Sequence, residues 1–217
     1  MADDALFDAS EEKTFLTGRP FREFADPAPL DKHGPATVLS MVNQKGGVGK
    51  TTSTINLGAC LAEQSRKVLL VDLDPQGALS AGLGVSHDEE QVTVYDLLFD
   101  NTTSIHGAIR HSNVSGLDLV PANIDLSAAE IQLVNEVGRE HTLARALRPV
   151  RNEYDIIIID CGPSLGLLTV NALACSQGVI IPMECEYFSL RGLALLTDTV
   201  ETVSYTHLRA HETGRNL

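Results

Sequence analysis

Residues 45–52 read Lys-Gly-Gly-Val-Gly-Lys-Thr-Thr and constrain the fold more than any other part of the chain. Three glycines within four positions let the backbone curl until several N–H groups point at one place. Lys50 adds an ammonium group there, and Thr51 adds a hydroxyl of the kind that coordinates Mg²⁺. Such a loop predicts a nucleoside triphosphate site, preceded by a strand and followed by a helix.

The loop departs from the common phosphate-binding pattern G-x-x-x-x-G-K-[ST]. Gln44 occupies the position of the first glycine, and a second lysine, Lys45, stands at the front edge. Six specified residues of this kind arise by chance in about one in 10⁵ chains of this length. The residues expected to contact the nucleotide are Gly46, Gly47, Val48, Gly49, Lys50, Thr51 and Thr52.

Short apolar runs alternate with helical patterns from residue 37 onward. Strands are predicted at 37–42, 68–72, 117–121, 156–160 and 179–182, and helices at 52–63, 127–137, 140–147, 165–174 and 190–200. Four consecutive isoleucines, 156–159, indicate a strand buried on both faces, as in a parallel sheet. The pattern predicts an α/β fold with a doubly wound, mostly parallel sheet and helices on both faces.

Two of the predicted strands end in aspartate. Asp72 and Asp74 follow the second strand, and Asp160 follows the fourth. A carboxylate at the end of a buried strand is costly unless a cation meets it, and Mg²⁺ held by Thr51 would be that cation. Asp160 fits this metal-supporting role. Of Asp72 and Asp74, one could support the metal while the other orients water; alternatively, Asp74 or Asp160 caps a helix.

The composition limits the class of protein. The chain has 217 residues, of which 43% are hydrophobic and 21% charged, enough for one α/β domain. Its N-terminus is acidic where a signal peptide is basic, and no apolar run approaches the roughly 18 residues of a membrane span. We therefore expect a cytoplasmic protein with no membrane partner. A net charge of −13 argues against a broad DNA-binding face on these residues.

The two ends of the chain differ from its middle. Residues 1–36 hold eight acidic and four basic residues and four prolines, which predicts a disordered, acidic extension with a short helix near 21–24. The nucleotide-binding domain is then expected over 37–202. Four cysteines without a C-x-x-C pair are expected to be reduced thiols: Cys60, Cys161, Cys175 and Cys185.

Four segments together resemble the ParA/Soj chromosome and plasmid partition ATPases, which carry a deviant form of the phosphate loop. The segments are 43–52, 71–77, 159–165 and 184–188, and the resemblance spans residues 37–202. Gly162 departs from the family, which often has proline at that position. The resemblance implies an ATPase in which MgATP closes a face-to-face homodimer that coats DNA nonspecifically. It also implies a ParB-type partner that stimulates hydrolysis, and a nucleoid-associated location.

The resemblance also implies roles for individual residues. Lys45 would cross to the phosphates of the partner, Lys50 would bind the β- and γ-phosphates, and Thr51 would coordinate Mg²⁺. Asp74 would help to position the attacking water, and Asp160 would support the metal with Asp72 beside it. A lysine supplied by the partner would act like an arginine finger on a loose phosphoryl transition state.

The family pattern stops after about Thr202. The family continues with segments that complete the sheet, contact adenine and bind DNA. Here residues 203–213 instead resemble the translation of a sequencing-library adapter, so 203–217 are expected to be a non-native tail and the sheet to be incomplete at this end.

Three alternatives remain open at this point. A MinD-like membrane-cycling ATPase shares the loop, but Asp74-Pro75-Gln76-Gly77 favours partition. A nitrogenase-reductase-like protein would need cysteines that bridge an iron–sulfur cluster, a pattern that this chain does not match. The chain could also be a nucleotide-binding fragment without turnover.

Overall fold

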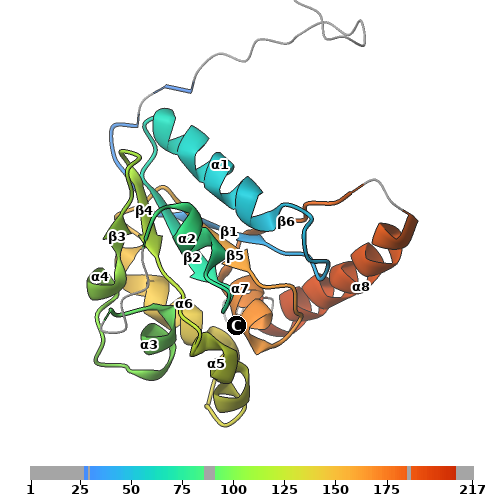
Figure 1. The fold of residues 1–217 in the computed structure, drawn as a ribbon. Helices are drawn as coiled ribbons and strands as arrows, with labels where there is room; N and C mark the ends of the chain where they lie inside the picture. Colours follow the sequence, from blue (N-terminus) through green and yellow to red (C-terminus); the bar gives the residue numbers. More distant parts are fainter. Residues whose placement is uncertain (1–26, 29, 86–90, 185–186, 209–217) are drawn as a thin grey trace, which may run out of the picture.

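The computed structural model describes residues 27–28, 30–85, 91–184 and 187–208. Most of the acidic extension, with the helix predicted near 21–24, lies outside the described residues, and so does Cys185. From Thr37 onward strands alternate with helices in a layered arrangement (Figure 1).

Within the described residues, a six-stranded sheet has the order β3-β4-β2-β5-β1-β6. Its strands are β1 (Thr37–Met41), β2 (Val68–Leu73), β3 (Arg110–His111), β4 (Leu117–Val120), β5 (Ile156–Cys161) and β6 (Gly178–Ile180). Neighbouring strands are parallel, except that β3 runs antiparallel to β4. The predicted fold class is confirmed. The sequence did not reveal β3, because it has two residues and both are polar.

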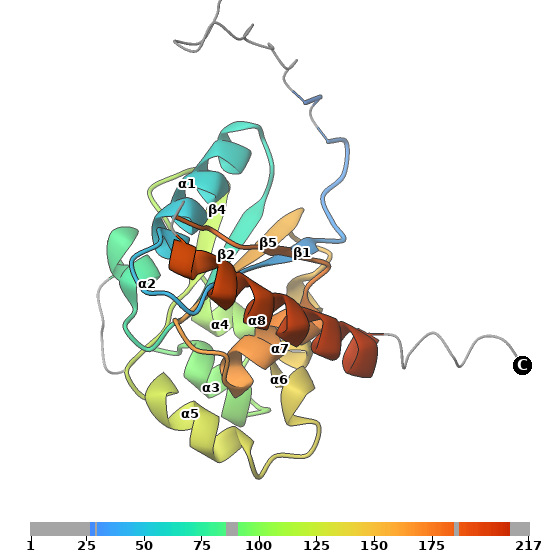
Figure 2. The same cartoon turned by 90° about the vertical axis from the view of Figure 1, so that its right-hand side faces the viewer.

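The helices lie on both faces of the sheet. They are α1 (Lys50–Glu63), α2 (Ala78–Gly82), α3 (Val94–Phe99), α4 (Ile105–Ala108), α5 (Leu126–Leu133), α6 (Thr142–Leu147), α7 (Leu167–Cys175) and α8 (Tyr187–Val203). Shorter 3₁₀ turns cover Arg139–His141 and Arg148–Val150. Helices α1 and α2 pack on one face and α3 to α7 on the other, while α8 packs beside α7 (Figures 1 and 2).

Four differences from the predicted helices have local causes. Helices α2, α3 and α4 have only 5, 6 and 4 residues, too few for a helical period to stand out. Helix α5 ends at Leu133, four residues before its expected end, and Gly138 follows with a φ of +64°. Val203, the first residue of the predicted non-native tail, is buried, and a π-helical turn covers Ser204–Leu208. The tail itself stays a prediction.

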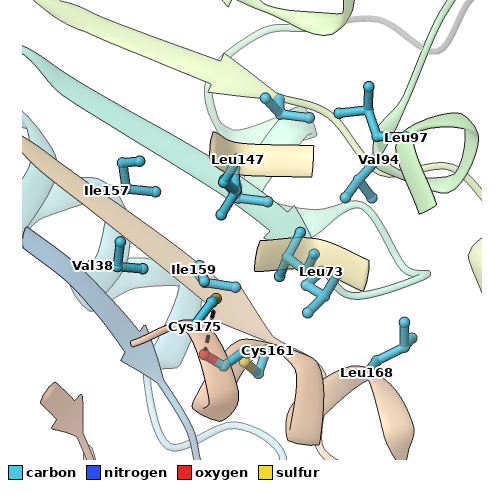
Figure 3. Close-up of a cluster of buried hydrophobic side chains, with 14 of the residues drawn as sticks. Val38, Leu73, Val94, Leu97, Leu147, Ile157, Ile159, Cys161, Leu168 and Cys175 are labelled. Carbon is cyan, nitrogen blue, oxygen red and sulfur yellow. Dashed lines mark hydrogen bonds between the residues drawn. The ribbon is translucent and has the colours of Figure 1, made fainter. Parts of the chain in front are cut away.

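The isoleucine run of β5 supplies both apolar layers of the core. Ile157 and Ile159 belong to the larger cluster, on the side of α3 to α7, which Figure 3 shows. Ile158 belongs to the smaller cluster beneath α1 and α2. Since alternate side chains of a strand point to opposite faces, burial of all three confirms that this strand is covered on both sides.

Asp155 ties the chain together at the amino ends of the strands. Its carboxylate accepts hydrogen bonds from Gly34 N at 3.1 Å and Lys67 N at 2.8 Å, and lies 2.7 Å from His33 Nδ1. One side chain therefore connects the residues that lead into β1, β2 and β5.

Gly58 lies where α1 crosses the sheet. A Cβ atom there would be 3.0 Å from Leu70 Cδ2 and 3.1 Å from Leu117 Cδ1. Gly58→Leu should therefore lower the free energy of unfolding by about 1–3 kcal/mol, because it overpacks a filled core. Urea denaturation measures the change. Cys60→Leu, at an exposed position of the same helix, is the control, and an equal loss in both variants would contradict the packing explanation.

Candidate functional site

The predicted site residues meet at the carboxyl ends of three adjacent strands. In the sheet β5 lies between β1 and β2, and Asp160 is in register with Met41 on one side and with Asp72 on the other. The glycine-rich loop follows β1, so it starts beside both aspartates. This edge of a parallel sheet is where ligands of doubly wound folds bind.

The glycine-rich loop has the conformation that its sequence predicts. Gly47 and Gly49 have φ angles of +77° and +85°, a region that disfavours side chains. A Cβ atom on Gly46 or Gly47 would meet no atom within 4 Å, so there is open space in front of the loop. Helix α1 begins at Lys50, and the N–H groups of its first turn face an anion placed there.

Lys50 is almost completely buried, with 7% of its surface exposed. Its Nζ atom donates a hydrogen bond to the carbonyl oxygen of Lys45 at 3.2 Å. A buried ammonium group favours an anionic neighbour, since a carbonyl dipole offsets only part of the cost of its desolvation. Phosphate oxygens in front of the loop would provide that neighbour.

Asp160 is held by two hydroxyl groups of α1. Thr51 Oγ1 donates to its Oδ2 atom at 2.6 Å, and Thr54 Oγ1 lies 3.3 Å from its Oδ1 atom. Burial raises the pKa of Asp160 to about 6, and the nearby charge of Asp72 raises it further, although the hydroxyl bonds oppose both effects. Because Thr51 donates its proton to Asp160, its oxygen lone pairs can face a metal ion. The sequence did not single out Thr54.

Asp72 is fully buried and faces the start of α2. Its Oδ2 atom accepts hydrogen bonds from Ser80 N at 2.9 Å and from Ser80 Oγ at 2.7 Å. Burial nevertheless raises its pKa. Asp72, rather than Asp74, therefore satisfies a first-turn amide of α2, and its role beside the metal stays a prediction. Ser80 is a partner that the sequence did not reveal.

Asp74 lies on the turn after β2 and is partly exposed. Its Oδ1 atom accepts a hydrogen bond from Gln76 N at 3.0 Å. A Cβ atom on Gly162 would lie 3.4 Å from Asp74 Cγ, so this carboxylate faces the segment that follows Asp160. The turn thus brings a solvent-accessible carboxylate next to the loop after β5, where a water molecule can reach it.

The donor set fits a magnesium ion that arrives with a nucleotide. Across the described residues, no group of three or more His, Cys, Asp or Glu side chains could hold a metal ion. Mg²⁺ usually takes one or two protein ligands and fills its other positions with phosphate and water, and Thr51 with Asp160 suits that pattern. Among the cysteines, burial raises the pKa of Cys161, and that of Cys175 to about 12, so both are unreactive thiols.

The comparisons with known proteins agree with this geometry. The model of a family described as an AAA domain (AAA_31) matches residues 36–211. The sporulation initiation inhibitor protein Soj of Bacillus subtilis is 52% identical over 166 residues, which are 76% of this chain and 65% of Soj. The chain belongs to the ParA/Soj family of partitioning ATPases.

Two further relatives of this ParA/Soj-family protein are informative. The uncharacterized protein Rv1708 of Mycobacterium tuberculosis is 70% identical over 188 residues, which are 87% of this chain and 59% of that protein. A crystal structure described as cobyrinic acid a,c-diamide synthase from Mycobacterium smegmatis, with bound ATP analogue and magnesium, superposes with a TM-score of 0.75. That protein is 44% identical, and the match covers 79% of this chain and 70% of that one.

The lengths and the helices set two limits. The ParA/Soj-family chain spans 59% of the length of Rv1708. In the part of the chain that the structure describes, no helix combines the length and the apolar character that crossing a bilayer requires.

Asp160→Asn tests the electrostatics of the metal-free site. The pKa of Asp160 is raised from 3.8 to about 6, so the folded state holds this proton more tightly than the unfolded state does. Ionised Asp160 therefore destabilises the fold above pH 6, and the cost fades as the pH falls toward 4. In EDTA at pH 8, Asp160→Asn should raise the free energy of unfolding by about 1–2 kcal/mol, with no gain at pH 4.

Asp100→Asn gives a control of opposite sign. Hydrogen bonds from Thr102 and Thr103 lower the pKa of Asp100 to about 2, so its charge stabilises the fold at neutral pH and that contribution is lost as the pH falls toward 2. Urea denaturation at both pH values should show a loss of stability for Asp100→Asn at pH 8. A loss for Asp160→Asn at pH 8 would contradict the repulsive character of the site.

Proposed function

We propose that this chain is a weak, partner-stimulated ATPase of DNA segregation that works in the cytoplasm on the nucleoid. MgATP binding drives formation of a homodimer, and the dimer holds DNA nonspecifically. A ParB-type protein then stimulates hydrolysis and release. The observation that carries the proposal is the meeting of Lys50, Thr51 and Asp160 with an open glycine-rich loop at one sheet edge.

The site residues divide the binding of MgATP among them. The N–H groups of residues 46–52 and the Lys50 ammonium bind the β- and γ-phosphates, which lie at the start of α1. Thr51 coordinates Mg²⁺, and Asp160 holds the Thr51 hydroxyl while adding negative charge. Asp72 contributes its charge from the next strand. The magnesium and ATP analogue in the solved Mycobacterium smegmatis relative support this assignment.

Hydrolysis needs two further groups. Asp74 lies on the solvent side of the site, where its carboxylate can orient the attacking water. Lys45 of the partner protomer brings positive charge to the γ-phosphate, where charge spreads over the oxygens in the transition state. DNA contacts and the ParB-type partner are supported by the family alone, through relatives such as the chromosome partitioning protein ParA of Myxococcus xanthus.

The two lysines of the loop should fail in different ways. In protein expressed from the complete source gene, Lys50→Ala should abolish MgATP binding in calorimetry, because the loop loses its buried cation. Lys45→Ala should bind MgATP as the unchanged protein does, yet form no dimer in sedimentation with ATP. A normal ATP-dependent dimer for Lys45→Ala would refute the crossing role, and unchanged affinity for Lys50→Ala would refute the nucleotide site.

Asp74→Ala separates binding from hydrolysis. The variant should bind ATP, form the dimer and stay on DNA, while phosphate release falls at least about a hundredfold for loss of the group that orients water. A phosphate-release assay and DNA retention at fixed salt measure the two properties. Asp125→Ala, an exposed carboxylate before α5, is the matched control and should keep wild-type turnover. Wild-type phosphate release from Asp74→Ala would show that another group positions the water.

The same assays test the alternative of a nucleotide-binding fragment without turnover. Such a protein would bind MgATP in calorimetry and release no phosphate, even with DNA and a ParB-type protein present.

A further inference from the structure

The side chain of Lys45 has a carboxylate partner in its own protomer. Lys45 Nζ and Glu184 Oε2 are 2.5 Å apart, and both side chains are about half exposed, at 44% and 46%. Glu184 is 139 residues further along the chain. The loop and this carboxylate are therefore brought together by the fold and not by the sequence.

Two neighbouring contacts fix where Glu184 lies. Val42 N donates to the carbonyl oxygen of Ile180 at 3.0 Å, which extends the pairing of β1 with β6. The Asn43 side-chain amide donates to the carbonyl oxygen of Pro182 at 2.7 Å, and Asn43 Oδ1 accepts from Lys45 N at 2.9 Å. Residues 181–184 thus run along the front of the loop and present Glu184 to Lys45 before the chain enters α8.

We propose that Glu184 is a positioning residue that holds the Lys45 ammonium in its own protomer until an ATP-loaded partner displaces it. The inference rests on the proposed function, since it takes Lys45 as the lysine that crosses the dimer interface. It adds a competitor: each crossing lysine must leave a carboxylate of its own chain. Glu184 therefore raises the ATP requirement of dimerisation and ties it to the segment that connects β6 with α8.

The exposure of the pair makes this hold reversible. An ion pair in contact with water is weak, because solvent and salt screen both charges. A triphosphate carries several negative charges, and a closing interface excludes the water that weakens their attraction for an ammonium group. The phosphates of a partner can therefore outcompete one carboxylate, whereas a protomer without a partner keeps the cis pair.

The first measurement is made on nucleotide-free protein, where dimerisation plays no part. Limited acetylation followed by mass spectrometry reports how readily the Lys45 amine reacts. In Glu184→Gln this reactivity should rise about two- to fivefold, because an ion pair favours the protonated, unreactive form and an exposed pair is weak. Glu63→Gln, an exposed carboxylate at the far end of α1, is the matched control and should leave it unchanged. No rise in Glu184→Gln overturns the proposed hold.

The second measurement is the ATP concentration for half-maximal dimerisation, by sedimentation at low and high salt. Glu184→Gln should need about two- to fivefold less ATP at low salt, and the difference should shrink at high salt, where the pair is screened in both proteins. An ATP requirement equal to or above that of Glu63→Gln overturns the competition. A Lys45→Ala protein that dimerises normally overturns the crossing role in the proposed function instead, and the acetylation result still decides whether Glu184 holds Lys45.

Discussion

Two buried carboxylates stand side by side on neighbouring strands, and the rest of the site is arranged around them. Asp72 and Asp160 are in register on β2 and β5, with 0% and 1% of their surfaces exposed. Burial and mutual repulsion raise the pKa of Asp160, and neither effect is useful to a protein that only has to fold. Each carboxylate is therefore stabilised separately: Asp72 by Ser80 on α2, and Asp160 by hydroxyl groups on α1. A divalent cation is the partner that such a pair lacks.

Much of this arrangement could be predicted from the sequence, because it depends on local patterns. The isoleucine run identified β5, and the order of strand, glycine-rich loop and helix placed the phosphates at the start of α1. Since the carboxyl ends of parallel strands meet at one edge, Asp72, Asp74 and Asp160 were expected together. The elements that escaped prediction, such as β3 and α2, are too short to show a period.

What the sequence could not predict are the partners of these groups. Ser80 and Thr54 are ordinary hydroxyl residues on helices, and nothing in their immediate surroundings marks them as ligands of Asp72 and Asp160. Glu184 belongs to a family segment, yet its pairing with Lys45 depends on β6 lying next to β1. Such contacts follow from the three-dimensional register of strands. Motif spacing carries no information about it.

The Asp155 anchor places the beginning of the described chain at the opposite edge of the sheet from the nucleotide site. His33 and Gly34 contact this carboxylate just before β5 begins, whereas Asp160 lies near the other end of the same strand. A six-residue strand spans about 20 Å, so the two edges are well separated. A fluorophore attached near Pro27 would therefore sit away from both ATP and the face where two copies meet, which makes that end the natural place for a reporter of assembly.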